Sequence, residues 1–142
     1  MKPGLLQIGT IGDAMANQLG PHFDLIRLPV DHTQPEFLAQ HGAEFKAVLY
    51  LGGNGVTDDL MTALPALRII SNYGVGYDTI DAKSAAKRGI IVTHTPNVLN
   101  DEVANTAILL WFAVSRQLLL NDAYVRAGRW EHEGAMPLSR SV

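Results

Sequence analysis

The sequence predicts an open, doubly wound α/β domain of about five strands, followed by one long helix. Three observations carry this prediction: short, nearly continuous apolar runs, longer polar-faced segments between them, and an extended apolar helix pattern after the fifth run. Continuous apolar runs are typical of parallel strands that are covered on both faces. Five alternations of strand and helix favour a flavodoxin-like sheet with strand order 2-1-3-4-5. The expected strands are Leu5–Gly9, Phe23–Leu28, Ala47–Leu51, Leu67–Ser71 and Ile90–Thr93.

The segments between these runs carry helix signals. Acidic residues early, basic residues late and a glycine after the last turn suit the helix dipole and the left-handed C-terminal cap. Thr57 is expected to cap the third helix, and Thr33 is a candidate cap of the second. Asp78 or Thr79 is the candidate cap of the fourth helix. The expected helices are Asp13–Leu19, Gln34–His41, Thr57–Leu64 and Thr79–Arg88.

A longer helix is expected from about Asp101 to Val125, with Asn100 as its cap and Gly128 close to its end. Its length would be ~35 Å at the rise of an α-helix. Its middle, residues 104–114, is apolar on almost every side, which is typical of a helix buried all round. The preceding domain can cover one of its faces, so we expect a further domain or a second subunit to cover the others. A fold-back of the chain is the alternative. No further helix or strand is expected in the tail.

Composition excludes several classes of function. The formal net charge of −3 offers no basic surface for a nucleic-acid backbone, and the absence of cysteine removes disulfides, thiolate catalysis and thiolate metal sites. No stretch reaches the roughly 18 consecutive apolar residues of a membrane span, and the N-terminus lacks the regions of a secretory signal. We therefore expect a cytoplasmic protein that binds neither nucleic acid nor membranes.

The loop after the first strand has some features of a dinucleotide-binding loop. Ligands of open α/β sheets bind beyond the carboxyl ends of the strands. Gly9 and Ala14 occupy two positions of that fingerprint, and Asp31 lies about twenty residues on, but Ile11 stands where the middle glycine is needed. We interpret this loop as an ordinary turn. The loop over residues 51–56 lacks the Lys-Ser or Lys-Thr of a nucleoside-triphosphate loop.

The loop after the fourth strand offers an anion site or a simple turn. Gly74 and Gly76 flank Val75, and successive backbone N–H groups in such a loop can hold a carboxylate. Because the third and fourth strands are neighbours, both glycine-rich loops are expected to face one crevice. The five histidines are scattered, so no metal pair is predicted, and we interpret His94 as a loop residue rather than a catalytic one.

Several segments resemble D-isomer-specific 2-hydroxyacid dehydrogenases. The resemblance lies in the loop sequence LRIISNYGVGYDTID over residues 67–81 and in AAKRGIIVTHTPNVL over residues 85–99. Residues 101–107, DEVANTA, are similar to that family's interdomain helix, and Gly128-Arg129-Trp130 is similar to the segment before its nucleotide-binding domain. Within the family, the sequence looks most like glyoxylate, hydroxypyruvate or hydroxyphenylpyruvate reductases.

The resemblance implies a division of the chain and a set of backbone contacts. It implies a substrate-binding domain over 1–98, an interdomain helix over 99–127, and a tail over 128–142 that leads to a Rossmann domain outside this chain. Two groups of site residues are implied. Substrate binding falls to Leu51, Gly52, Val75 and Gly76, of which the last two bind the carboxylate, and the approach to the nicotinamide falls to Leu99, Val103 and Thr106.

The function implied is the reduction of a small 2-oxo acid to a D-2-hydroxy acid with NADH or NADPH. The family's catalytic Arg, Glu and His lie in or after the Rossmann domain, so the resemblance places no catalytic residue and no metal in this chain, which is expected to be inactive alone. A homodimer is expected, and an exposed helix could also drive non-native pairing. The alternative is a standalone, non-enzymatic flavodoxin-like module that dimerises through its long helix.

Overall fold

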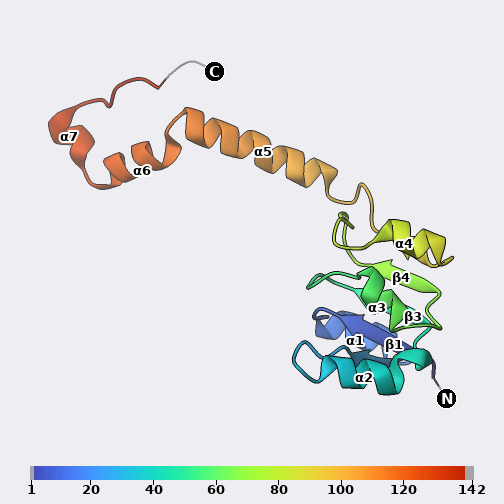
Figure 1. Cartoon of the computed structure of the whole chain (residues 1–142). Coiled ribbons are helices and arrows are strands. Elements are labelled where there is room, and N and C mark those ends of the chain that lie inside the picture. Colours follow the sequence, from blue (N-terminus) through green and yellow to red (C-terminus); the bar gives the residue numbers. More distant parts are fainter. Residues whose placement is uncertain (1, 140–142) are drawn as a thin grey trace. The chain divides into compact units, whose positions relative to one another are not determined.

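The computed structural model describes residues 2–139 and divides into two compact units. The first unit ends at Val98 and the second begins at Leu99. The first holds the sheet and its helices, and the second holds the helices that follow (Figure 1).

The first unit is built on a parallel sheet whose strand order is β2-β1-β3-β4-β5, which confirms the predicted order. The order reverses between β1 and β3, and ligands of open α/β sheets usually bind beyond the carboxyl ends of the strands near such a reversal. In register, Leu6 of β1 lies opposite Val48 of β3, and Tyr50 at the end of β3 lies opposite Asn72 at the end of β4. The strands are β1 (Gly4–Ile8), β2 (Asp24–Arg27), β3 (Ala47–Tyr50), β4 (Ile69–Asn72) and β5 (Ile91–Thr93).

Short helices connect the strands, and their caps only partly follow the prediction. The Thr57 side chain accepts a hydrogen bond from the Leu60 N–H at 3.3 Å, as expected for a cap. Thr33 occupies a cap position, but its hydroxyl donates to Asp31 instead. The elements are α1 (Asp13–Leu19), α2 (Gln34–His41), the 3-10 helix η1 (Gly42–Glu44), α3 (Asp58–Thr62) and α4 (Ala82–Lys87).

The start of α4 differs from the prediction. Its cap is Asp81, whose carboxylate accepts a hydrogen bond from the Ser84 N–H at 2.9 Å, so the expectation of Asp78 or Thr79 was wrong. The reason is a tertiary contact, because Ile80 forms an isolated parallel bridge with Val56. This bridge holds Ile80 outside the helix, which therefore begins only after Asp81.

The main core cluster of the first unit lies on one face of the sheet, while Leu5 and Leu49, which point to the other face, are also buried. Alternate strand residues point to the same face, and those of the three central strands pack there against α2, α3 and α4. Ile91, on the edge strand β5, remains 60% exposed. The fully or nearly fully buried members of this core include Leu6, Ile8, Phe45, Val48, Tyr50, Met61, Leu64, Ile70 and Ala85.

The second unit corrects the prediction of one long helix. The expected helix over residues 101–125 is divided into α5 (Asn100–Ser115) and α6 (Leu118–Arg126), with Gln117 in the left-handed conformation at φ 50° between them. The Asn121 side chain donates to the carbonyls of Arg116 and Gln117 at 2.9 and 3.0 Å, and so satisfies acceptors near the break. Leu99, not Asn100, occupies the cap position of α5.

A further short helix, α7 (Arg129–Glu133), follows Gly128, although no helix was expected in the tail. Arg129 pairs with Glu133 at 2.6 Å, one turn apart, which supports this helix. Tyr124 fixes it to α6, because its hydroxyl donates to the Gly134 carbonyl at 2.7 Å and its ring lies 4.7 Å from the Arg129 guanidinium carbon.

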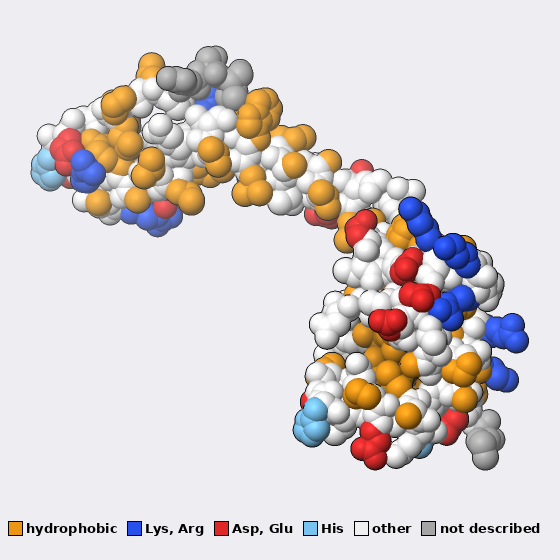
Figure 2. All heavy atoms as spheres, viewed as in Figure 1, with side chains coloured by type: hydrophobic (Ala, Val, Ile, Leu, Met, Phe, Trp, Pro, Cys, Tyr) orange, Lys and Arg blue, Asp and Glu red, His pale blue; other side chains and the backbone are white. Residues whose placement is uncertain are grey.

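The apolar side chains of α5 are not enclosed by α6 or α7. Trp111 and Phe112 are 55% and 47% exposed. Figure 2 shows apolar side chains spread along this part of the molecule. Among residues 2–139, no single helix is long and apolar enough to cross a membrane; α5 and α6, bent by 58° at their break, reach that length and composition only when counted together.

Candidate functional site

The loops after β1 and β3 touch each other closely. Gly9 has a φ of +94°, and a Cβ there would lie 2.9 Å from the Gly52 carbonyl oxygen. The Leu51 N–H donates to the Ile8 carbonyl at 2.9 Å and closes the same contact. Gly9 is therefore required because two backbones approach each other there, which explains its place in the sequence without a bound phosphate.

The start of α1 does not suit a pyrophosphate. Gly12 precedes the helix, and Asp13 puts a carboxylate in its first turn. A negative side chain there competes with any bound anion for the positive end of the helix. The residues do not fit a dinucleotide phosphate, which agrees with the interpretation of this loop as a turn.

Tyr50 ties the loop after β3 to the loop after β4. Its buried hydroxyl lies 2.8 Å from the Thr79 hydroxyl and 3.4 Å from the Gly53 carbonyl oxygen. Next to it, the Val56 N–H donates to the Thr79 carbonyl and the Asp81 N–H donates to the Val56 carbonyl, each at 3.0 Å. The two glycine-rich loops thus form one connected structure at the carboxyl edge of the sheet.

The side chain of Asn72, which is 5% exposed, supports the loop after β4 through two hydrogen bonds. Its Nδ2 donates to the Gly74 carbonyl at 3.2 Å and to the Gly76 carbonyl at 2.8 Å. His94 adds a contact from the segment after β5, with its Nδ1 2.9 Å from the Val75 carbonyl oxygen. Its ring lies edge-on to Tyr77, with 5.0 Å between the ring centroids.

The predicted substrate residues follow the ends of two adjacent strands, β3 and β4. Within residues 2–139, the N–H groups of Gly52, Val75 and Gly76 donate no hydrogen bond, whereas that of Leu51 is used by the sheet. Neither loop contains a lysine or arginine. The arrangement offers neutral backbone donors of the kind that bind small anions.

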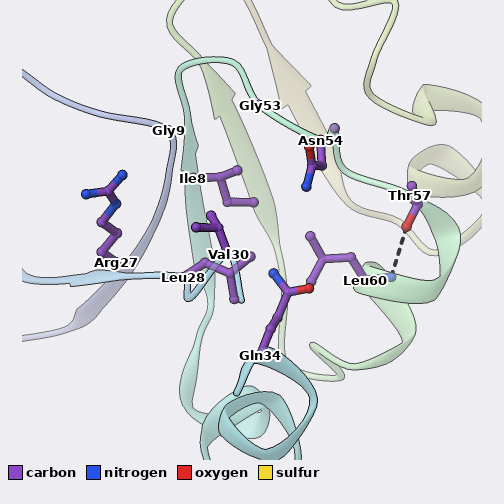
Figure 3. A pocket seen from close by; sticks show the side chains of 11 residues that line it. Ile8, Gly9, Arg27, Leu28, Val30, Gln34, Gly53, Asn54, Thr57 and Leu60 are labelled. Atoms are coloured by element: carbon purple, nitrogen blue, oxygen red, sulfur yellow. Dashed lines mark hydrogen bonds between the residues drawn. The ribbon is translucent and has the colours of Figure 1, made fainter. Parts of the chain in front are cut away.

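A cavity that the sequence analysis missed lies beside these loops (Figure 3). It has a volume of about 390 Å³ and an apolar floor that includes Ile8, Leu28 and Leu60. The side-chain amides of Gln34 and Asn54 point into it from opposite sides (Figure 3). None of the four predicted substrate residues lines it. Arg27 also lines the cavity, so the lining combines two neutral amides with one positive charge. The only available sequence signal was an asparagine set among glycines.

The three predicted cofactor residues lie along α5, in the second unit. Leu99, Val103 and Thr106 are spaced by four and three positions and therefore share one face. They line a groove of about 440 Å³ together with Glu102, Ala107 and Leu110. A mostly apolar groove of this kind fits one face of a planar ring such as nicotinamide.

Two carboxylates of the first unit, Asp31 and Asp58, have lowered pKa values because of contacts outside the two glycine-rich loops. Hydrogen bonds from the Thr33 hydroxyl and N–H lower the pKa of Asp31. Contacts with Ser84 and Arg88 lower the pKa of Asp58. In the described part of the chain, no group of three His, Cys, Asp or Glu residues could hold a metal ion.

Residues 15–134 match the family model described as D-isomer specific 2-hydroxyacid dehydrogenase, catalytic domain. The chain belongs to this family. The match confirms the resemblance seen in the sequence.

Individual relatives agree with this assignment. The chain is 39% identical to a 2-ketogluconate reductase of Gluconobacter oxydans over 99% of its own length and 44% of that protein. It is 36% identical to a hydroxyphenylpyruvate reductase of Plectranthus scutellarioides over 90% of its own length and 41% of that protein. The chain thus spans less than half the length of these relatives.

A solved structure supports the fold as well. The NADPH-dependent glyoxylate/hydroxypyruvate reductase of Sinorhizobium meliloti, in complex with NADP and malonate, superposes with a TM-score of 0.79 at 36% identity. The superposition covers 100% of this chain and 43% of that one. The predicted α/β fold class is confirmed.

Proposed function

We propose that this chain forms the substrate-binding part of an NADH- or NADPH-dependent reductase that converts a small 2-oxo acid to a D-2-hydroxy acid. Family membership supports the reaction class. The observation that carries the proposal is the set of backbone N–H groups at Gly52, Val75 and Gly76, which donate no hydrogen bond within residues 2–139. Backbone N–H groups in a glycine-rich loop suit a carboxylate, which has acceptors and no donors when ionised.

The residues of α5 would form one wall of the cofactor site. A nicotinamide cofactor, when bound, supplies the hydride. Leu99 and Val103, which are 52% and 63% exposed, would contact one face of its ring and keep water away from it. Thr106 on the same face adds a hydroxyl that can donate or accept a hydrogen bond.

We also propose that the groups that polarise the keto oxygen and deliver the proton lie outside this chain. The loops of the site contain no lysine, arginine or histidine. The nearest histidine by contact, His94, uses Nδ1 on the Val75 carbonyl and so supports the loop. The isolated 142-residue chain is then expected to have no reductase activity.

Two measurements test this proposal. In the first, the purified chain is assayed with glyoxylate, hydroxypyruvate or 2-ketogluconate in the presence of NADH or NADPH. No turnover is expected. An amide NMR titration with malonate is expected to shift Val75 and Gly76, whereas malonamide, its neutral analogue, shifts neither. Turnover by the chain would contradict the external position of the catalytic groups. Unmoved resonances at both residues would contradict the carboxylate site.

A non-enzymatic module that dimerises through α5 is the second candidate, because α5 exposes large apolar side chains such as Trp111. The coding sequence after Val142 distinguishes the two. Continuation into a strand and a Gly-x-Gly-x-x-Gly loop supports the reductase. A stop codon directly after Val142 supports the module.

A further inference from the structure

Three successive carbonyl groups in the loop after β4 are each engaged by a side chain. The Asn72 amide holds the Gly74 and Gly76 carbonyls, and His94 lies at the Val75 carbonyl between them. The Thr95 N–H adds a second donor to the Gly74 oxygen at 3.0 Å. The carbonyl groups of Gly74, Val75 and Gly76 are therefore all held by hydrogen bonds within the first unit.

Fixing a carbonyl also fixes the N–H of the next residue. A peptide unit is planar and trans, so its C=O and N–H point in opposite directions. The contacts at the Gly74 and Val75 carbonyls thus turn the N–H groups of Val75 and Gly76 away from Asn72 and His94. These two N–H groups donate to nothing in the described part of the chain. They are aimed before any ligand arrives.

The chemistry of the two side chains is determined by their partners. Both oxygens facing the Asn72 amide are carbonyls, which only accept, so Nδ2 must face them and both of its hydrogens are used. The His94 Nδ1 likewise must carry a hydrogen to bond the Val75 carbonyl. An apolar side chain at position 72 would leave the Gly76 carbonyl without its side-chain donor and the Gly74 carbonyl with the Thr95 N–H alone. An apolar side chain at position 94 would remove the donor to the Val75 carbonyl.

We propose that Asn72 is a positioning residue for the substrate carboxylate, with His94 as its second support. The proposal rests on the proposed function and names what sets the direction of the Val75 and Gly76 donors. Asn72 does not touch the ligand. It lowers the cost of binding because the loop is ordered in the binding conformation beforehand.

Gln7 provides a matched control for a merely structural role. Gln7 is 8% exposed and Asn72 is 5% exposed, so both are buried. The side-chain amide of Gln7 also donates to a carbonyl of the loop after its own strand, the Gly9 carbonyl, at 2.8 Å. Its loop contacts Gly52 but touches neither the Val75 nor the Gly76 N–H, the two groups whose direction is tested. Gln7→Ala and Asn72→Ala are therefore expected to lower the melting temperature alike and to differ in ligand binding.

The experiment is an amide NMR titration of the 142-residue chain and its variants with malonate. Asn72→Ala and Asn72→Asp are expected to raise the malonate Kd at Val75 and Gly76 about tenfold, the order of effect of one lost hydrogen bond to a charged group. Gln7→Ala is expected to leave the Kd unchanged. His94→Leu weakens binding, and His94→Asn, which keeps an N–H donor, restores most of it.

Each outcome separates this inference from the proposed function. Wild-type binding with equal affinities for Asn72→Ala and Gln7→Ala would overturn the positioning role and leave the carboxylate site standing. A wild-type chain that shifts neither Val75 nor Gly76 would overturn both. If the Asn72 variants do not fold, the exposed His94 carries the test, and equal affinities for His94→Leu and His94→Asn overturn the inference.

Discussion

The guanidinium of Arg88 lies 2.7 Å from the carboxylate of Asp58 and joins the end of α4 to the first residue of α3. Arg88 also donates to the Thr62 hydroxyl at 2.8 Å, and the Ser84 hydroxyl donates to the same Asp58 carboxylate. The hydrogen bond from Ser84, followed by that from Arg88, lowers the pKa of Asp58 below its ordinary range. Two helices on the core side of the sheet are thus connected through one ionised carboxylate.

This network predicts a contribution to acid sensitivity. The pKa of Asp58 is lower in the folded state than in the unfolded chain. The ionised carboxylate therefore adds to the free energy of unfolding above the unfolded pKa of about 4, and this stabilisation is lost as the pH falls through the pKa of the folded state. Asp58→Asn should lower the melting temperature at neutral pH and flatten its decline in acid. Asp59→Asn, the neighbouring position in the same helix turn, is the control. Identical pH profiles for the Asp58 variant and the wild type would refute the linkage.

The close approach of Gly55 to Thr79 allows a steric test of the connection between the loops after β3 and β4. Its φ is +88°, and a Cβ there would lie 2.3 Å from the Thr79 carbonyl oxygen, against the bridge between Val56 and Ile80. Gly89→Ala, at φ +71° with open space around it, measures the conformational cost alone, about 1 kcal/mol. Gly55→Ala should cost at least ~2 kcal/mol more in urea unfolding, because backbone must move. Similar losses for the two variants would show that the contact is easily relieved.

The hydroxyl pair of Tyr50 and Thr79 predicts a coupling between the loops. Tyr50→Phe and Thr79→Val each remove one partner of a 2.8 Å hydrogen bond and should each cost about 1 kcal/mol. The double variant should cost less than the sum, by roughly 0.5–1.5 kcal/mol. Tyr124→Phe, which removes a bond in the second unit, controls for general effects and should show no such coupling with Thr79→Val. Additive losses for Tyr50 and Thr79 would contradict the coupling.

The sheet could be predicted because parallel strands buried on both faces need continuous apolar runs, which few other segments of the chain have. The helix over Gln34–His41 was predicted with the bounds that are observed, since Gly42 ends the pattern. The cap of α4 could not be chosen from the sequence, because Asp78 and Asp81 both suit a cap. The start of α4 is determined by the bridge between Ile80 and Val56, which is a contact between segments distant in the sequence.

The break between α5 and α6 was hidden for a similar reason. Gln117 is neither glycine nor proline, and its left-handed conformation is supported by a side chain four residues later, Asn121. The loop with Val75 and Gly76 was visible as a glycine pattern. The part played by Asn72 was not, because it depends on a side chain that folds back under its own loop.

The exposed apolar surface of α5 and α6 predicts self-association of the isolated chain. An apolar surface of this extent seldom stays in contact with water on a monomeric protein. We expect oligomers or aggregates in sedimentation velocity across a wide range of protein concentration. Leu109→Lys, at a position 62% exposed on α5, should shift the chain toward monomer. Leu138→Lys, at a position 99% exposed beyond α7, adds the same charge and should leave association unchanged. A wild-type chain that remains a monomer throughout, or equal effects of the two lysines, would show that α5 does not drive association.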